Sequence, residues 1–227
     1  MDEAYRHEYK LPINLSDYHS LRRRVRQVAA PDAHADADGR YFVRSLYFDN
    51  TDDKALREKL YGLPQREKFR IRLYNHDAGF IRLEKKSKRN GLGLKDSAAL
   101  TKAQVEQLLA GDASWLLESR NPLCLEFYAK RQSQRLKPKT IVDYVREAYH
   151  YPFGNVRITF DMDVRTGLYA TDLFDPNLRT CTTGAPGVLL MEVKYDAFLP
   201  DVIRDMLQTN ARHIEANSKY AACRMYG

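Results

Sequence analysis

The residues best suited to chemistry in this sequence are arginines and lysines concentrated in one segment. Residues 54–95 contain thirteen Lys or Arg against four Asp or Glu, a local balance of +9 that exceeds the net charge of +7 for the whole chain. A basic stretch is most often a solvated surface, but an excess confined to one segment also indicates a polyanionic partner.

The spacing of the charged residues places them on one side of candidate β-strands. In the run Phe69-Arg70-Ile71-Arg72-Leu73, the two arginines share one face of a strand and the three apolar residues share the other. Four further segments alternate in the same way. Their polar faces are Arg6, Glu8 and Lys10; Arg82, Glu84, Lys86 and Lys88; Arg157, Thr159 and Asp161; and Glu192 and Lys194.

Two sheet architectures agree with this pattern. An open antiparallel sheet can present one polar face to water, which explains any single strand of this kind. The concentration of Arg and Lys over several strands favours a closed antiparallel barrel of about eight strands, with the charged side inside and helices packed on the apolar outside. Like charges crowded in such an interior repel one another, so the barrel predicts an anion site in its lumen.

The elements that must position these faces are strands with helices inserted between them, which gives the α+β class. Besides the strand near the N-terminus, strands are expected over residues 41–48, 66–75, 79–88, 123–133, 139–146, 155–163 and 188–195. Helices are expected over residues 16–30 and 51–61, after the capping box of Thr101 and Gln104, shortly after Gly111, and over residues 199–209 and 211–222. The run Asn90-Gly91-Leu92-Gly93 is expected to be a turn.

Composition limits the class of protein. A chain of 227 residues can fold as one domain, residues 1–227, without disulfides or a structural metal. Its three cysteines, Cys124, Cys181 and Cys223, have no CxxC spacing, which argues against a disulfide framework or a zinc site and favours the cytoplasm. No stretch approaches the roughly 18 apolar residues of a membrane span, so the chain is expected to be soluble.

Eight short motifs stand in a fixed order along the chain. They are Arg6-His7-Glu8-Tyr9-Lys10, Tyr47-Phe48-Asp49-Asn50, Arg70-Ile71-Arg72-Leu73-Tyr74, Glu84-Lys85-Lys86, Tyr144-Val145-Arg146, Val156-Arg157-Ile158-Thr159-Phe160-Asp161, Met191-Glu192-Val193-Lys194 and Ser218-Lys219-Tyr220. The ordered set, from Tyr5 to Tyr220, resembles the VTC domain. This is the catalytic domain of the vacuolar transporter chaperone polyphosphate polymerase, within the triphosphate tunnel metalloenzyme superfamily. The resemblance implies an antiparallel barrel that forms a basic tunnel.

The resemblance also implies roles for individual residues. Those expected to act at the transferred phosphoryl group are Arg70, Arg72, Lys86, Arg146 and Arg157. Those expected to bind the remaining phosphates are Lys10, Lys59, Lys95, Tyr144, Lys194, Ser218 and Lys219. Two positions depart from the family pattern, because Lys59 stands where Arg is usual and Ala216 stands where a basic residue is usual.

A divalent metal, Mn²⁺ or Mg²⁺, is the cofactor that the resemblance implies. Glu192 is expected to hold it, since carboxylate oxygen is a natural ligand for such hard cations. Glu8 and Glu84 face the same side as Glu192 by strand parity, and each either binds the metal or orients a neighbouring arginine.

Three functions follow from these implications. The first is a polymerase that transfers the γ-phosphate of ATP to a phosphate or polyphosphate chain, a reaction that demands alignment and charge neutralisation more than a strong base. With water as the acceptor, the same tunnel would be a triphosphatase. The third is a module that binds polyphosphate without turnover. The six histidines are scattered, and none is expected to be catalytic.

Other partners are less favoured. Nucleic-acid binding is not expected, because the apolar residues Phe69, Ile71 and Leu73 lie opposite the arginines, where bases could not stack beside them. The SPX and transmembrane domains of the eukaryotic complex have no counterpart in the sequence, so any membrane partner would be a separate protein. Replacing Arg70 and Arg72 together by Ala is expected to abolish triphosphate binding and to leave the fold intact or firmer, because repulsion is relieved.

Overall fold

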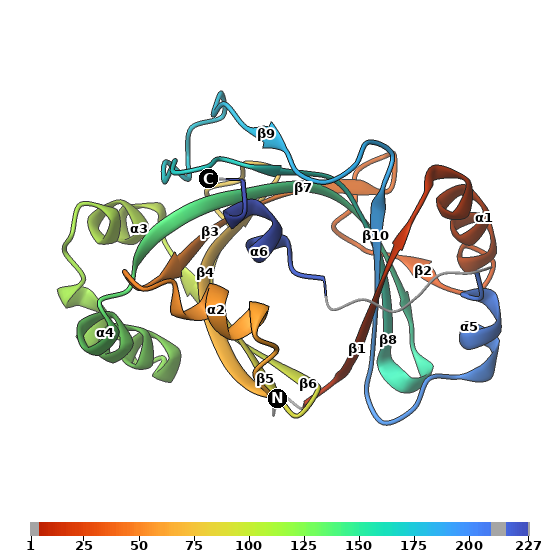
Figure 1. Cartoon of the computed structure of the whole chain (residues 1–227), viewed down its shortest axis with the longest axis horizontal. Coiled ribbons are helices and arrows are strands. Elements are labelled where there is room, and N and C mark those ends of the chain that lie inside the picture. The colour runs from red at the N-terminus through yellow and green to blue at the C-terminus, as the bar shows by residue number, and fades with distance from the viewer. Residues whose placement is uncertain (1–4, 210–216, 227) are drawn as a thin grey trace.

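One antiparallel sheet organises the chain, whose structure is a computed structural model that describes residues 5–209 and 217–226 (Figure 1). The main strands follow the order β1-β10-β8-β7-β3-β4-β5-β6, while the short strands β2 and β9 pair with β7 and β8. The strands are β1 (His7–Ile13), β2 (Ala30–Pro31), β3 (Arg40–Asp49), β4 (Gln65–Tyr74), β5 (Ile81–Arg89), β6 (Leu92–Leu100), β7 (Lys137–Tyr151), β8 (Val156–Thr166), β9 (Cys181–Thr182) and β10 (Leu189–Tyr195).

The helices are short, and all but α5 and α6, which follow the last strand, lie between strands in sequence. They are α1 (Leu15–Val25), α2 (Lys54–Leu60), α3 (Lys102–Leu109), α4 (Pro122–Gln134), α5 (Asp201–Met206) and α6 (Lys219–Arg224), with 3₁₀ helices at Ser114–Glu118 and Phe153–Asn155. Among the described residues, no helix is both long enough and apolar enough to cross a membrane.

The apolar faces of the strands lie on the outside of the curled sheet, where helices cover them (Figure 1). Helices α3 and α4 cover one half, and Phe127 of α4 meets Phe48 and Phe69 with ring centroids 5.1 and 5.2 Å apart. Helices α1 and α5 cover the other half, where Leu21 and Ile203 belong to one buried cluster with strands β1, β8 and β10. The predicted facing of the strands, apolar side outward and charged side inward, is confirmed.

The predicted closed barrel is wrong, because the sheet curls without closing. Strands β1 and β6 are its edges, and among the described residues they are joined by one isolated bridge between Arg6 and Gly93. Each of these two residues donates its backbone N–H to the carbonyl of the other over 2.9 Å.

Strand register explains why the edges do not pair further. Following β1 from Arg6 towards Ile13, the antiparallel partners would be Leu92 and then Gly91 and Asn90. The last two form the turn before β6, so no strand is present there to pair with β1. In the other direction, partners for residues 94–100 would have to precede Arg6, and of those residues only Tyr5 is described.

One predicted strand is wrong, because residues 123–133 form helix α4. The Asn121 side chain accepts a hydrogen bond from the backbone of Leu123 over 2.9 Å, and Pro122 occupies the first helical position, as is common at helix N-termini. The buried residues Leu123, Cys124 and Phe127 recur with the spacing of a helix face.

Two further differences concern chain segments near the site. The turn predicted at residues 90–93 is confirmed at Asn90 and Gly91, both with positive φ, but Leu92 and Gly93 already belong to β6. The helix predicted over residues 211–222 falls partly outside the described residues, as does Ala216. Within the described part, α6 begins at Lys219 after the capping residue Ser218.

Candidate phosphate-binding site

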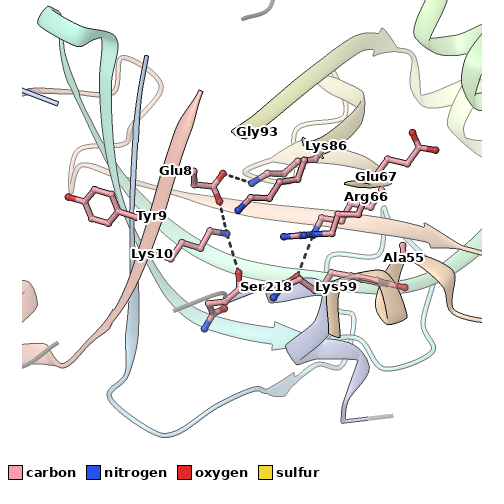
Figure 2. A pocket seen from close by; sticks show the side chains of 14 residues that line it. Glu8, Tyr9, Lys10, Ala55, Lys59, Arg66, Glu67, Lys86, Gly93 and Ser218 are labelled. Atoms are coloured by element: carbon pink, nitrogen blue, oxygen red, sulfur yellow. Dashed lines mark hydrogen bonds and ion pairs between the residues drawn. The ribbon is translucent and has the colours of Figure 1, made fainter. Parts of the chain in front are cut away.

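The concave side of the sheet encloses three adjoining cavities of about 350, 50 and 230 Å³. They share lining side chains, and Lys86 of β5 borders all three. We call the three cavities together the inner channel. In Figure 2, Glu8 and Lys10 of β1 point across the first cavity towards Lys86, whereas Tyr9 projects to the opposite side of the strand.

The smallest cavity lies between the other two and has a strongly basic lining. Of the residues that the structure describes, eight basic side chains and one carboxylate, Glu192, border it, together with Tyr47, Tyr144 and Ser218. The basic residues are Lys10, Lys68, Arg70, Arg72, Lys86, Arg146, Lys194 and Lys219. They come from six different elements, so this concentration of charge exists only in the folded chain.

Two carboxylates and three lysines form a cluster where β1, β10 and β5 meet. The β1–β10 register pairs Lys10 with Glu192 and Glu8 with Lys194. The Lys10 ammonium lies 2.9 Å from Glu8 and 3.7 Å from Glu192, while Lys86 lies 2.6 Å from Glu8 and Lys194 lies 3.0 Å from Glu192. Burial alone would raise the pKa of both carboxyls, but the surrounding ammonium groups hold each pKa well below its usual range. Both carboxylates are therefore ionised at neutral pH.

Strands β4 and β5 form a second cluster around Glu84. Arg70 lies opposite Glu84 in the strand register and donates to it from Nε over 2.7 Å, and the Nη1 of Arg70 donates to the Tyr47 hydroxyl over 2.8 Å. Arg72 and Lys95 lie 3.7 and 3.3 Å from the same carboxylate. Burial raises the pKa of Glu84, but these cations outweigh burial and lower it strongly. Glu84 thus holds the two arginines side by side.

A third cluster joins β7, β8 and α6 around Asp161. Arg146 donates from Nε and Nη2 to the two oxygens of Asp161 over 2.6 and 2.8 Å, and Lys219 is ion-paired with the same carboxylate. The Lys219 ammonium also lies 4.9 Å from the ring centroid of Tyr144, whose hydroxyl accepts a hydrogen bond from Arg72 over 2.9 Å. Burial raises the pKa of Asp161, but Arg146 and Lys219 lower it to about 2.

Asp49 at the end of β3 fixes the two helices that lie beside the channel. Its carboxylate accepts hydrogen bonds from the backbone of Ala55 and Leu56 in α2, over 2.9 and 3.2 Å, and from the Tyr220 hydroxyl of α6 over 2.7 Å. Tyr220 follows directly after Lys219. Asp49 therefore sets the position from which α6 presents its basic side chain.

Lys68 of β4 is the basic residue of the central cavity that sequence reasoning missed. Among the described residues, no carboxylate lies within ion-pair distance of it; its ammonium donates to Ser218 Oγ over 3.4 Å and lies 5.2 and 5.7 Å from the rings of Tyr47 and Tyr220. Burial, with the charges of Lys10 and other cations, lowers the pKa of Lys68 to about 8 despite the opposing effect of Tyr47. Alternation could have found it, because Lys68 shares a strand face with Arg70 and Arg72.

The two ends of the inner channel differ in character. At one end, which we call the basic end, Lys59, Arg66 and Lys88 border the cavity of about 350 Å³. At the other, Arg157 is ion-paired with Asp32 over 2.8 Å and donates to the Tyr41 hydroxyl over 2.9 Å. We call this the Arg157 end.

Comparison with known protein families identifies the family of this chain. Residues 5–226 match the family model of the VTC domain. The chain belongs to the VTC domain family. No curated protein matches it.

Several solved structures are similar to this VTC domain. A putative adenylyl cyclase from Hippeastrum, described as having a dominant triphosphatase activity, is similar with a TM-score of 0.58 and 16% identity over 97% of this chain and 96% of that one. A putative adenylate cyclase from Bacillus halodurans has a TM-score of 0.49 and 15% identity, covering 92% and 88% of the two chains. The PH1819 protein from Pyrococcus horikoshii has values of 0.46 and 13%, covering 97% and 99%. The Hippeastrum protein and this chain share the same fold.

The residues to which the sequence assigned phosphate-binding roles come together in the VTC domain. Every one of them lines one of the three cavities, from Lys59 at the basic end to Arg157 at the other. What the structure adds is the pairing of these residues with carboxylates. Asp161, to which the sequence analysis assigned no role, forms ion pairs with both Arg146 and Lys219.

Glu8 and Glu192 are the two neighbouring carboxylates of the channel that could take part in holding a divalent metal. Among the described residues, no group of three His, Cys, Asp or Glu side chains could hold a metal ion. However, Glu8 and Glu192 are both ionised and share Lys10 and Lys86 as neighbours. Mg²⁺ is commonly held by one or two carboxylates together with substrate phosphates. Glu84 lies apart from this pair, within the Arg70 cluster.

Proposed function

We propose that this VTC domain transfers the γ-phosphate of ATP to a phosphate or polyphosphate chain inside the inner channel, with the help of a divalent metal. The observation that carries the proposal is the central cavity, where eight basic side chains and one carboxylate of the described part of the chain lie between two further cavities. A channel with two open neighbours can hold a donor on one side and an acceptor on the other, which a polymerase requires.

Charge neutralisation is the chief contribution of the channel to this reaction. Arg70 and Arg72, held side by side by Glu84, suit the oxygens of the transferred phosphoryl group, and Lys86 and Arg146 border the same cavity. A terminal oxygen of the acceptor forms a bond to the γ-phosphorus while the bond to the β–γ bridging oxygen breaks, and ADP leaves with that electron pair. Glu192 and Glu8 would hold the metal, which supplies further neutralisation of phosphate charge.

The acceptor chain is best accommodated at the basic end. Lys59, Arg66 and Lys88 border that cavity, and Lys68 and Ser218 border both it and the central cavity. Ammonium groups on flexible stems act as mobile point charges, so they tolerate a chain that shifts by one phosphate after each transfer.

Triphosphate hydrolysis is the second candidate. The Hippeastrum neighbour, which has the same fold, is described as having a dominant triphosphatase activity. With water in place of the acceptor phosphate, the same residues would neutralise the same charge.

The two candidates are separated by incubating purified protein with ATP and Mn²⁺ and analysing the products. Long phosphate chains on a gel support the polymerase, whereas free phosphate alone supports the triphosphatase. Glu192→Ala should lose turnover in either case. Undiminished tripolyphosphate binding in that variant, with no turnover of the wild type under any metal, would instead indicate a binding module.

A further inference from the structure

A fourth cavity, of about 480 Å³, lies next to the Arg157 end and is larger than any cavity of the inner channel. It shares Tyr74 and Arg157 with the neighbouring channel cavity, so the two adjoin. The proposed phosphoryl transfer makes no use of this space.

The lining of the fourth cavity is aromatic, unlike that of the channel. Tyr41, Tyr74 and Phe80 border it, and the ring centroid of Tyr74 lies 5.8 Å from each of the other two. Phe80 is 43% exposed, although a large apolar side chain gains by burial. Aromatic faces contribute little to holding phosphate, but they are the usual platform for a nucleobase, which stacks on them.

The charge of the lining also changes at the Arg157 end. Within residues 5–209 and 217–226, Arg157 is the single Lys or Arg that borders the fourth cavity, and it is paired with Asp32 over 2.8 Å. Asp77 borders the cavity as well, and one of its carboxylate oxygens accepts the Gly79 N–H over 2.7 Å while the other has no hydrogen bond among the described residues. Carboxylates repel phosphate, but they accept hydrogen bonds from ribose hydroxyls and from amino groups of bases.

We propose that the fourth cavity binds the nucleoside of a nucleoside triphosphate whose phosphates extend past Arg157 into the inner channel. This inference rests on the proposed function and deepens it, because it gives the nucleoside part of the ATP donor a binding site of its own. It also gives the channel a direction: the donor occupies the Arg157 end, and the basic end remains available to the acceptor chain.

Phe80→Ala tests the proposal, because Phe80 is half-exposed, lies outside the phosphate-binding residues and can be truncated without opening the core. Binding of ATP and of tripolyphosphate is measured by calorimetry in EDTA, so that no metal-dependent turnover occurs. ATP affinity should fall by about fivefold or more, as expected for the loss of a stacked base. Tripolyphosphate affinity should stay within about twofold of the wild type, and Phe80→Trp should retain ATP affinity.

The matched control is Phe153→Ala, which removes an aromatic ring that is 68% exposed and does not border any of the four cavities. It should change neither affinity. Unchanged ATP binding in Phe80→Ala, or an equal loss for ATP and tripolyphosphate, would overturn the nucleoside site and leave the proposed function standing. Failure of the wild type to bind either ligand would overturn both.

Discussion

Glu84 shows that individual carboxylates, and not only a bound anion, relieve repulsion inside the channel. Arg70, Arg72 and Lys95 all contact this one buried side chain. Without the two arginines, Glu84 would keep only Lys95, whose side chain is 53% exposed. This pairing changes the expectation that removing the arginines would leave the fold intact or firmer.

Replacing Arg70 and Arg72 together by Ala should therefore weaken both binding and folding. Tripolyphosphate affinity should fall by at least about 100-fold, because two charge-assisted contacts are lost. The free energy of unfolding should fall by about 3 kcal/mol, because a buried carboxylate loses its partners. Calorimetry and urea denaturation measure the two effects. Adding Glu84→Gln should restore most of the stability but none of the binding; a double variant as stable as the wild type would contradict the pairing.

Lys68 and Tyr47 should make phosphate binding depend on pH. The pKa of Lys68 is about 8, lowered chiefly by burial; that of Tyr47 is about 7, because Arg70 and Lys68 outweigh the effect of burial. As pH rises, Lys68 loses its positive charge and Tyr47 gains a negative one, so the net positive charge of the cavity falls. Bound phosphate favours the protonated form of both residues. Tripolyphosphate affinity should thus be highest at acidic to neutral pH and fall by at least about tenfold between pH 6.5 and 9.

The double variant Lys68→Met with Tyr47→Phe should flatten that pH profile, as measured by calorimetry across the same range. Lys102→Met is the matched control, since this side chain lies on α3, is 53% exposed and does not border the channel. An unchanged slope in the double variant would assign the pH dependence to other groups, such as Lys86 and Lys194, whose pKa values burial also lowers.

At the scale of elements, Asp49 connects one strand to two helices, so its effect should reach the site through α6. Asp49→Asn keeps the shape of the side chain but removes its charge and one acceptor. It should lower the free energy of unfolding by about 2 kcal/mol and also weaken tripolyphosphate binding, because α6 carries Ser218 and Lys219. Tyr220→Phe removes only the hydroxyl contact and should have about half that effect on stability. Normal binding by a destabilised Asp49→Asn variant would show that α6 is held by other contacts.

Element type was predictable where the sequence has a clear period. Strands β4, β5, β8 and β10 alternate strictly, and all four are confirmed close to their expected bounds. The error at α4 arose because its buried residues are few and its aromatic and β-favouring residues mimic a strand. Strand β6 was missed because Gly93 and the pair Ala98 and Ala99 give it little β-propensity; its pairing with β5 overrides that local preference.

For the candidate site, the sequence predicted which residues face the channel but not which of them pair with one another. Strand parity correctly placed Arg70, Arg72 and Lys86 on one face, and the family resemblance supplied their roles. Parity says nothing about which carboxylate meets which cation, because that depends on register and on the curvature of the whole sheet. The sequence did offer the alternative that Glu84 orients a neighbouring arginine, as it does with Arg70, but the full set of partners in the three clusters could not be derived from the sequence.

At the scale of the whole molecule, the single bridge between Arg6 and Gly93 can be converted into a covalent link. A side chain fits at Gly93, because an added Cβ would have no neighbour nearer than 3.8 Å. Directly hydrogen-bonded residues of antiparallel strands have Cα atoms about 5.5 Å apart, a separation typical of disulfides, so Arg6→Cys with Gly93→Cys should form one. In a Cys181→Ser background, the oxidised protein should be more stable than the reduced protein by about 3 kcal/mol. Denaturation with and without reductant measures the difference, and equal stability would mean that the two edges do not stay together in solution.

That bridge bears on how a long polymer reaches the interior. Parting the two margins of the sheet breaks two backbone hydrogen bonds and the Glu8–Lys86 contact, which together cost about 2–5 kcal/mol. For the proposed polymerase, a long polyphosphate could then enter sideways between the parted edges, whereas a closed barrel would admit it only by threading from one of its ends. The disulfide between residues 6 and 93 should therefore slow the binding of long polyphosphate chains while leaving the binding of tripolyphosphate unaffected.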